Sequence, residues 1–403
     1  MATATGRLSE LAKLFSRLGC LAFGGPAAHI AMLEDEVVER RGWLDRQHFL
    51  DLIGATQLIP GPNSTEMVLH VGYERAGVRG LLVAGACFIG PAALLTGVLA
   101  WAYTRWGLLP NVDPLLAGLR PAVMAIIAAA LLKLGKKAVG SAPGTAAPVA
   151  LAVAVAAAVL AGVPELTALA AGGLVGTALF FALRRPQPPP PAPRGQDPSG
   201  DDGPRPGMAA ALPVAAASAA APAAAAGAVS LWQLGLVFLK VGAVLYGSGY
   251  VLIAFLEGDL VQRLGWLSQA QLLDAIAIGQ LTPGPVLTTA TFVGFVLAGV
   301  PGAIVATAAI FLPSFVFVCL LNPWVPRLRR RPVTAAFLDA VNVAALALMA
   351  AVTLRLASTA LVDGPAWLIA VGSAVALVRF KLSPLWLVPA AAFAGWLSYG
   401  LPG

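Results

Sequence analysis

The residues best placed for chemistry flank two Pro-Gly-Pro triplets, each inside an otherwise apolar stretch. The triplets are Pro60-Gly61-Pro62 and Pro283-Gly284-Pro285. Two prolines with a glycine between them interrupt any helix. A backbone broken at membrane depth survives only where protein or a water-filled cavity covers it. A half-helix that begins after such a break has free N–H groups and the positive end of its dipole, so each triplet indicates a place for an anion.

Polar side chains follow both triplets. The hydroxyls among them can donate to an oxyanion or can simply cap the new helix, and both interpretations stay open. These candidate substrate-binding residues are Asn63, Ser64, Thr65, Thr288 and Thr289. Glu66 follows the first triplet as well, and we consider it for coupling transport to a second ion.

Two Gly-rich segments form a second pair of matched breaks. They are Phe23-Gly24-Gly25-Pro26 and Tyr246-Gly247-Ser248-Gly249. Glycine lets backbones approach closely, so one interpretation is tight helix packing. The alternative is a second opening onto the substrate path, which makes Gly24, Gly25, Gly247 and Ser248 candidate substrate-binding residues.

Arg17 and Lys240 occupy matching positions shortly before the two Gly-rich breaks, within apolar sequence. A cation in a membrane segment is costly and is usually functional, although near a helix end it can extend to the interface. Because both copies keep a basic residue, we predict that Arg17 and Lys240 contact the anion.

Three further charged residues are considered for coupling. Glu34 and Glu257 end the helices that follow the Gly-rich breaks. Their carboxylates can relay protons, but we favour salt bridges within the adjoining loops. Arg120 lies beside Pro121 in an apolar run, where it serves either coupling or a structural ion pair.

Composition places these residues in a membrane protein. Of the 403 residues, 59% are hydrophobic and only 11% are charged, which is too little polar surface for a soluble globule. The apolar runs are long enough to span a bilayer as helices and lack the period-two alternation of a transmembrane β-barrel. They are Leu81–Tyr103, Val112–Leu132, Ala146–Gly162, Leu166–Leu183, Leu231–Leu256 and Ala303–Leu321. The sequence therefore predicts an all-α polytopic membrane protein.

The lysines, arginines, cysteines and histidines do not indicate a nucleic acid or a metal as partner. The net charge of +7 comes from residues scattered at helix ends, which is typical of cytoplasmic loops rather than of a nucleic-acid-binding surface. The three cysteines and three histidines are unclustered. We predict no metal site, no cofactor and no nucleic-acid partner, and the sequence does not indicate an oligomeric state.

The chain is an internal duplication. Residues 23–62 align without gaps onto 246–285 with 18 of 40 positions identical. The segment between the copies is rich in proline and alanine and cannot form a core. We predict a first repeat over residues 1–183, a disordered linker over 184–230 and a second repeat over 231–403.

The distribution of lysine and arginine predicts opposite orientations for the repeats. If basic segments face the cytoplasm, the linker and the 35–47 loop lie inside, whereas the equivalent 258–269 loop lies outside. The N-terminus is a misfit, because this scheme places Arg7 and Lys13 outside. Inverted repeats with broken helices at the midplane are a hallmark of secondary transporters.

The sequence resembles the long, two-domain form of the chromate ion transporter family. The resemblance rests on the FGGP segment, the LEDEVVERRGWLD and LEGDLVQRLGWLS loops, and the doubled Gln-x-x-Pro-Gly-Pro. It implies a secondary transporter in the inner membrane that exports chromate from the cytoplasm, with sulfate as a structural analogue of the substrate. The second repeat departs from the pattern where Gly247-Ser248-Gly249 replaces Gly-Gly-Pro.

Three alternatives define the functional expectation. The basic residues and the helix N-termini after the triplets support a small oxyanion as substrate, with protons as a candidate coupling ion. An importer of sulfate or another oxyanion is the nearest rival within transport. A membrane-embedded reductase is more distant, because it would need a redox centre that the sequence does not indicate.

Overall fold

A computed structural model describes residues 4–22, 25–57, 59–106, 112–141, 146–183, 229–246, 249–321 and 332–400, and all regular elements in these ranges are helical. This confirms the predicted all-α class. The predicted linker lies almost wholly outside the described residues, as do Phe23, Gly24, Gly247 and Ser248.

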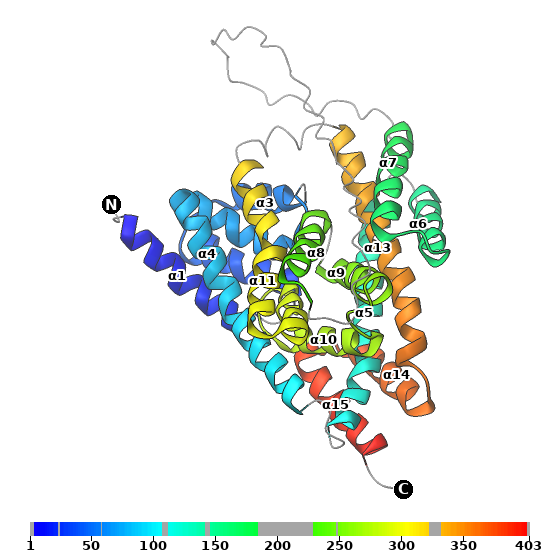
Figure 1. The fold of residues 1–403 in the computed structure, drawn as a ribbon. Coiled ribbons are helices and arrows are strands. Elements are labelled where there is room, and N and C mark those ends of the chain that lie inside the picture. The colour runs from blue at the N-terminus through cyan, green and yellow to red at the C-terminus, as the bar shows by residue number, and fades with distance from the viewer. Residues whose placement is uncertain are drawn as a thin grey trace, which may run out of the picture.

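The first repeat contains seven α-helices and one short π-helix among its described residues. Helix α1 packs along α4 (Figure 1). The elements α2, η1 and α3 lie between these two helices in the chain. The elements are α1 (Ala4–Leu21), α2 (Gly25–Glu34), η1 (Asp35–Arg40), α3 (Arg46–Thr56), α4 (Asn63–Trp106), α5 (Asp113–Ser141), α6 (Ala146–Leu160) and α7 (Glu165–Leu183).

The second repeat follows the same order of elements up to its long kinked helix. Helix α8 packs along α11, as α1 does along α4, and α11 also lies against α4 (Figure 1). The elements are α8 (Leu231–Val244), η2 (Gly249–Val251), α9 (Leu252–Leu256), η3 (Glu257–Arg263), α10 (Gln269–Leu281), η4 (Val286–Thr288), α11 (Thr289–Leu321), α13 (Pro332–Ala360), α14 (Gly364–Arg379) and α15 (Pro384–Tyr399).

The apolar run Leu231–Leu256 is not one spanning helix. Helix α8 ends at Val244, Leu245 is extended, and the next described helical residue is Gly249. The interruption falls at the second Gly-rich segment, where the sequence predicts a break. Helices also end and restart around both Pro-Gly-Pro triplets, because proline removes a backbone donor and clashes with the preceding turn.

Local sequence signals explain where the helices after the repeated loops begin. The Asp45 side chain accepts a hydrogen bond from the His48 N–H at the start of α3. At the equivalent place, Ser268 and Gln271 form a reciprocal capping box at the start of α10. Both caps satisfy backbone donors that a helix N-terminus leaves open.

Helices α4 and α11 are each folded back at the same point of the repeat. Gly77 and Gly299 both have φ of 62°, a conformation that favours glycine, and the preceding alanines have φ of −150° and −147°. A Cβ on Gly72 would lie 2.6 Å from the carbonyl oxygen of Gly80. The residues after each triplet therefore form a short half-helix that turns back on the rest of its helix.

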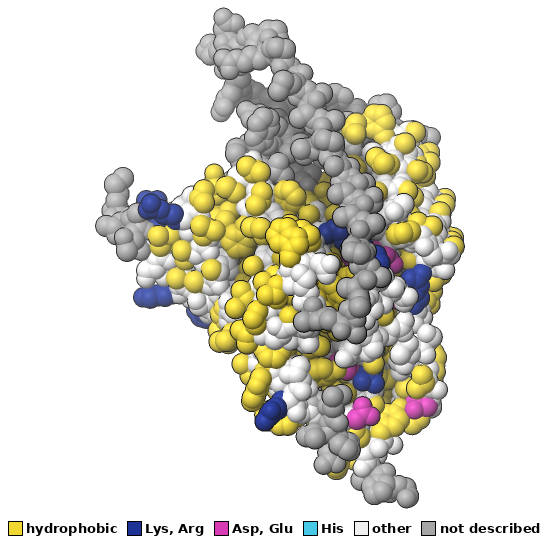
Figure 2. Space-filling view, in the orientation of Figure 1, with side chains coloured by type: hydrophobic (Ala, Val, Ile, Leu, Met, Phe, Trp, Pro, Cys, Tyr) yellow, Lys and Arg dark blue, Asp and Glu magenta, His cyan; other side chains and the backbone are white. Residues whose placement is uncertain are grey.

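Five helices in the described chain are long and apolar enough to cross a membrane. They include both folded-back helices, and the spans are Asn63–Trp106, Asp113–Lys136, Glu165–Leu183, Val286–Leu320 and Val333–Ala360. Hydrophobic side chains dominate the face seen in Figure 2, and charged side chains are sparse there. The chain is a multi-pass membrane protein, and the opposite orientation of its repeats stays a prediction.

Candidate substrate-binding site at the crossed helix breaks

Each Pro-Gly-Pro triplet is bonded to the Gly-rich break of the other repeat. The Gly61 N–H donates to the Leu245 carbonyl at 2.6 Å, and the Gly284 N–H donates to the Ala22 carbonyl at 2.9 Å. Leu245 and Ala22 are equivalent residues, so the two hydrogen bonds are reciprocal. Each triplet is therefore joined to the residue that precedes the Gly-rich segment of the other repeat.

The two triplets have different neighbours. A Cβ on Gly61 would lie 2.3 Å from Glu66 Oε1 and 2.4 Å from Ser314 Oγ. Past a one-residue gap the repeats align Pro91 with Pro313, so Ala92 is equivalent to Ser314. A Cβ on Gly284 would instead lie 2.7 Å from the Cβ of Ala92. The first triplet is thus packed against polar side chains, and the second against a methyl group and backbone oxygens.

Three buried side chains around the first triplet have polar atoms without a hydrogen-bond partner in the described part of the chain. They are Thr65 Oγ1, both carboxylate oxygens of Glu66, and Ser314 Oγ. Buried polar atoms are normally hydrogen-bonded, so a group of such orphans is a reason to expect a ligand. We call Gly61, Thr65, Glu66 and Ser314 the Glu66 chamber.

The remaining post-triplet hydroxyls are committed to the protein. Thr288 donates to the Pro285 carbonyl and Thr289 to the Val286 carbonyl, both at 2.9 Å. Ser64 Oγ lies 3.4 Å from His29 Nδ1. Thr288 and Thr289 thus bond back to carbonyls three residues earlier, which is not a helix cap, whereas Thr65 Oγ1 has no hydrogen-bond partner among the described residues. Asn63 begins α4 and is partly buried.

Arg17 and Lys240 each pair with an acid of their own repeat. Arg17 binds Glu36, and Lys240 binds Asp259. Glu36 and Asp259 are equivalent residues in the π-helices η1 and η3, so the ion pair is duplicated along with the backbone. This arrangement favours a role in holding the π-helices against α1 and α8 over direct contact with an anion.

Glu34 and Glu257 have diverged in their surroundings. Glu34 is partly exposed and lies 3.7 Å from Arg46, the first residue of α3. Glu257 is fully buried, accepts a hydrogen bond from Gln262 at 2.6 Å and lies 3.6 Å from Arg355. Arg355 also lies 3.8 Å from Glu165, so Glu257 belongs to a network that reaches α13 and α7 rather than a loop.

Arg120 forms a two-pronged ion pair with Asp274. Arg120 Nε donates to Oδ1 at 2.9 Å and Nη2 to Oδ2 at 3.1 Å. The Tyr103 hydroxyl donates to the same carboxylate at 3.0 Å. The structural alternative for Arg120 is therefore present, and it fastens α5 of the first repeat to α10 of the second.

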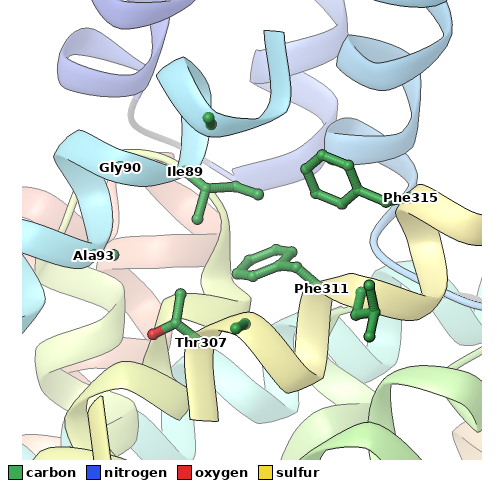
Figure 3. Close-up of a pocket in the computed structure, with 9 residues that line it drawn as sticks. Ile89, Gly90, Ala93, Thr307, Phe311 and Phe315 are labelled. Carbon is green, nitrogen blue, oxygen red and sulfur yellow. The ribbon is translucent and has the colours of Figure 1, made fainter. Parts of the chain in front are cut away.

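A cavity of about 370 Å³ between α4 and α11 does not suit an oxyanion. Figure 3 shows Phe311 and Phe315 of α11 pointing toward the helix that carries Ile89 and Gly90. Its polar side chain, Thr307, already bonds to Thr291 and to a backbone carbonyl. A dianion requires hydrogen-bond donors or cations in place of water, and an apolar cavity offers neither.

Sequence reasoning missed several of these residues. The acids Glu36 and Asp259 occupy matched positions, so the internal alignment contained a signal for both. Ser314 had no such signal because its counterpart is alanine. Asp274 was aligned with Asp51, but only the fold shows that the former is buried and the latter exposed.

The fold and the crossed breaks define a membrane transport protein of the broken-helix kind. Comparison with known proteins identifies its family. The family model for chromate transporters matches residues 9–177 and 232–396, so the chain belongs to the chromate transporter family.

Curated relatives match over nearly the full length. The chain is 34% identical to a chromate transport protein of Cupriavidus metallidurans, over 98% of this chain and 94% of the relative. It is 32% identical to a probable chromate transport protein of Synechococcus elongatus, over 96% and 95%. A chromate transport protein of Pseudomonas aeruginosa is 30% identical, over 97% and 92%. No solved structure gives a significant match.

Proposed function

We propose that this protein is a secondary active transporter that exports chromate from the cytoplasm across the inner membrane. The oxyanion binds beside the first triplet, at one of the two points where a triplet is joined to the other repeat. The observation that carries this proposal is the pair of reciprocal hydrogen bonds from Gly61 to Leu245 and from Gly284 to Ala22. A rearrangement of one repeat against the other would open this point alternately to the two sides.

The Glu66 chamber supplies the ligands for the anion. Thr65 and Ser314 have hydroxyls free to donate, and α4 begins two residues before Thr65. Hydroxyl donors and a helix N-terminus suit a tetrahedral oxyanion in a site without water. Arg17 and Lys240 act at a distance by holding η1 and η3 in place.

Transport of sulfate is the second candidate function. Chromate and sulfate have the same charge and shape, and hydroxyl donors do not distinguish them. Two of the relatives are named as chromate transport proteins, which favours chromate. Selectivity would depend on the size of the chamber and on the cost of dehydrating each anion.

Flux through membrane vesicles of defined orientation tests the proposal. Inverted vesicles that contain the protein should accumulate chromate when a lumen-positive membrane potential is imposed, and empty-vector vesicles should not. Chromate movement in neither orientation would refute the function. Sulfate transport at chromate-like rates, with strong competition between the two, would favour the second candidate.

A further inference from the structure

We propose that Glu66 carries a proton with the oxyanion, and that its protonated carboxyl group forms part of the anion site. This inference rests on the proposed function and assigns the coupling ion and the residue that binds it. Glu66 lies in the half-helix that follows the first triplet, with no exposed surface. Its Oε1 and the Ser314 hydroxyl both border Gly61, from opposite repeats.

The surroundings of Glu66 contain no compensating charge that the structure records. Neither carboxylate oxygen has a hydrogen-bond partner, and no salt bridge includes Glu66 among the described residues. Burying an ionised carboxylate without a partner is very costly, whereas a protonated one is neutral and can donate a hydrogen bond. The site is therefore built for a carboxyl group that exchanges a proton.

The titratable groups that face Glu66 come from three elements. Tyr246 follows α8 and interacts electrostatically with Glu66. His70 lies one helical turn later on α4, and His29 of α2 contacts Ser64 on the same half-helix. Tyr246 and His70 provide hydrogen-bonding groups through which a proton can reach the chamber.

A dianion and an ionised Glu66 exclude each other from one buried site. Two like charges a few ångströms apart repel strongly at low dielectric. Protonation removes this repulsion and adds a donor, so the anion and the proton each raise the affinity of the site for the other by the same factor. One chromate and one proton then cross together, and the pair carries one net negative charge.

The described part of the second repeat contains no equivalent chamber. Ala92 takes the place of Ser314, and the threonines after the second triplet bond to backbone carbonyls. Glu66 is therefore the acid that this inference assigns to the proton, which predicts one proton for each anion.

Proton uptake on anion binding tests the inference directly. Purified protein in weakly buffered detergent would be titrated with chromate in the alkaline range, where chromate itself is a dianion, and with sulfate as a second probe. The wild type should take up about one proton per anion, and its affinity should fall about tenfold per pH unit once free Glu66 is ionised. Glu66→Gln should bind the anion without proton uptake and with no such pH dependence, because the amide mimics the neutral acid.

Matched variants separate the outcomes. Glu39→Gln changes an exposed acid and should behave as the wild type. Ser314→Ala should weaken binding at every pH and leave the proton count unchanged. Wild-type proton uptake by Glu66→Gln, or failure of the folded variant to bind either anion, would overturn the assignment. If Glu66→Gln did not fold, the absence of proton uptake by the wild type would overturn it instead. A wild-type protein that binds and transports neither anion would refute the proposed function itself.

Discussion

The two repeats place nearly the same backbone around the crossed breaks but surround it with different side chains. Beside Gly61 lie Glu66 and Ser314, whereas beside Gly284 lies the methyl group of Ala92. The kinks, the π-helices and the ion pairs of Arg17 and Lys240 are duplicated. The comparison teaches that duplication supplied the scaffold and that a few residues outside the duplicated pattern supply the polar chemistry.

The largest effect is expected from adding a methyl group to the triplet glycines. Gly61 has φ of 149° and Gly284 has φ of 88°, so alanine strains both backbones. Gly61→Ala should reduce chromate flux to background because its Cβ would also displace Glu66 and Ser314. Gly284→Ala meets the fixed Cβ of Ala92 at 2.7 Å, so it should lower stability, but it leaves Glu66 and Ser314 in place and should retain more flux. Gly97→Ala, which has open space, serves as the control, and equal flux from all three variants would contradict the comparison.

The next effect distinguishes two aligned aspartates. Asp274→Ala leaves Arg120 without its partner, which should lower the free energy of unfolding by about 3 kcal/mol or more. Asp51 is exposed, and Asp51→Ala should change stability by less than about 0.5 kcal/mol. Thermal unfolding in detergent measures both. Similar shifts would show that the Arg120–Asp274 pair does not join the repeats as the structure indicates.

A smaller effect is expected at the duplicated ion pairs. Lys240→Gln should destabilise by about 1 kcal/mol, because among the described residues Asp259 then keeps the ion pair with Arg263 at 3.1 Å alone. Arg17→Gln should cost less, since Glu36 retains Arg40 and Arg41, both at 3.2 Å. Unfolding temperature and chromate affinity would be measured together. If the variants lost affinity for chromate while the unfolding temperature stayed unchanged, the result would support direct contact of Arg17 and Lys240 with the anion.

The smallest effect concerns the pH dependence of stability at η1. Burial opposes ionisation of Glu36, but the hydrogen bonds and charges of Arg41 and Arg17 outweigh it and lower the pKa of Glu36 below 4.5. A lowered carboxyl pKa contributes stability that is present above the unfolded-state pKa and is lost as the pH falls through the folded-state value. Glu36→Gln should therefore flatten the acid side of the unfolding-temperature profile. If Glu36→Gln and the wild type lost unfolding temperature equally at acid pH, the ion pairs of Glu36 with Arg17 and Arg41 would not contribute to stability as expected.

The internal alignment predicted where the helices break and which cations are matched, but it did not predict which residues contact one another. It located all four breaks and the matched cations, because proline and glycine act through local sterics that a sequence displays directly. It assigned Arg17 and Lys240 to the anion, whereas the fold places acidic partners beside both. Those acidic partners lie in the π-helices η1 and η3. Whether each acid reaches its cation depends on how η1 packs against α1 and η3 against α8, which local sequence does not display.

Composition and local pattern by themselves determined that this is a helical membrane protein, duplicated and broken at the two Pro-Gly-Pro triplets. Hydrophobic length and backbone sterics are properties of short segments, so no fold is needed to recognise them. Tertiary structure alone decided that Gly61 meets Leu245, that Arg120 meets Asp274 and that Glu66 faces Ser314. These contacts join residues far apart in the chain, and their geometry follows from packing one repeat against the other.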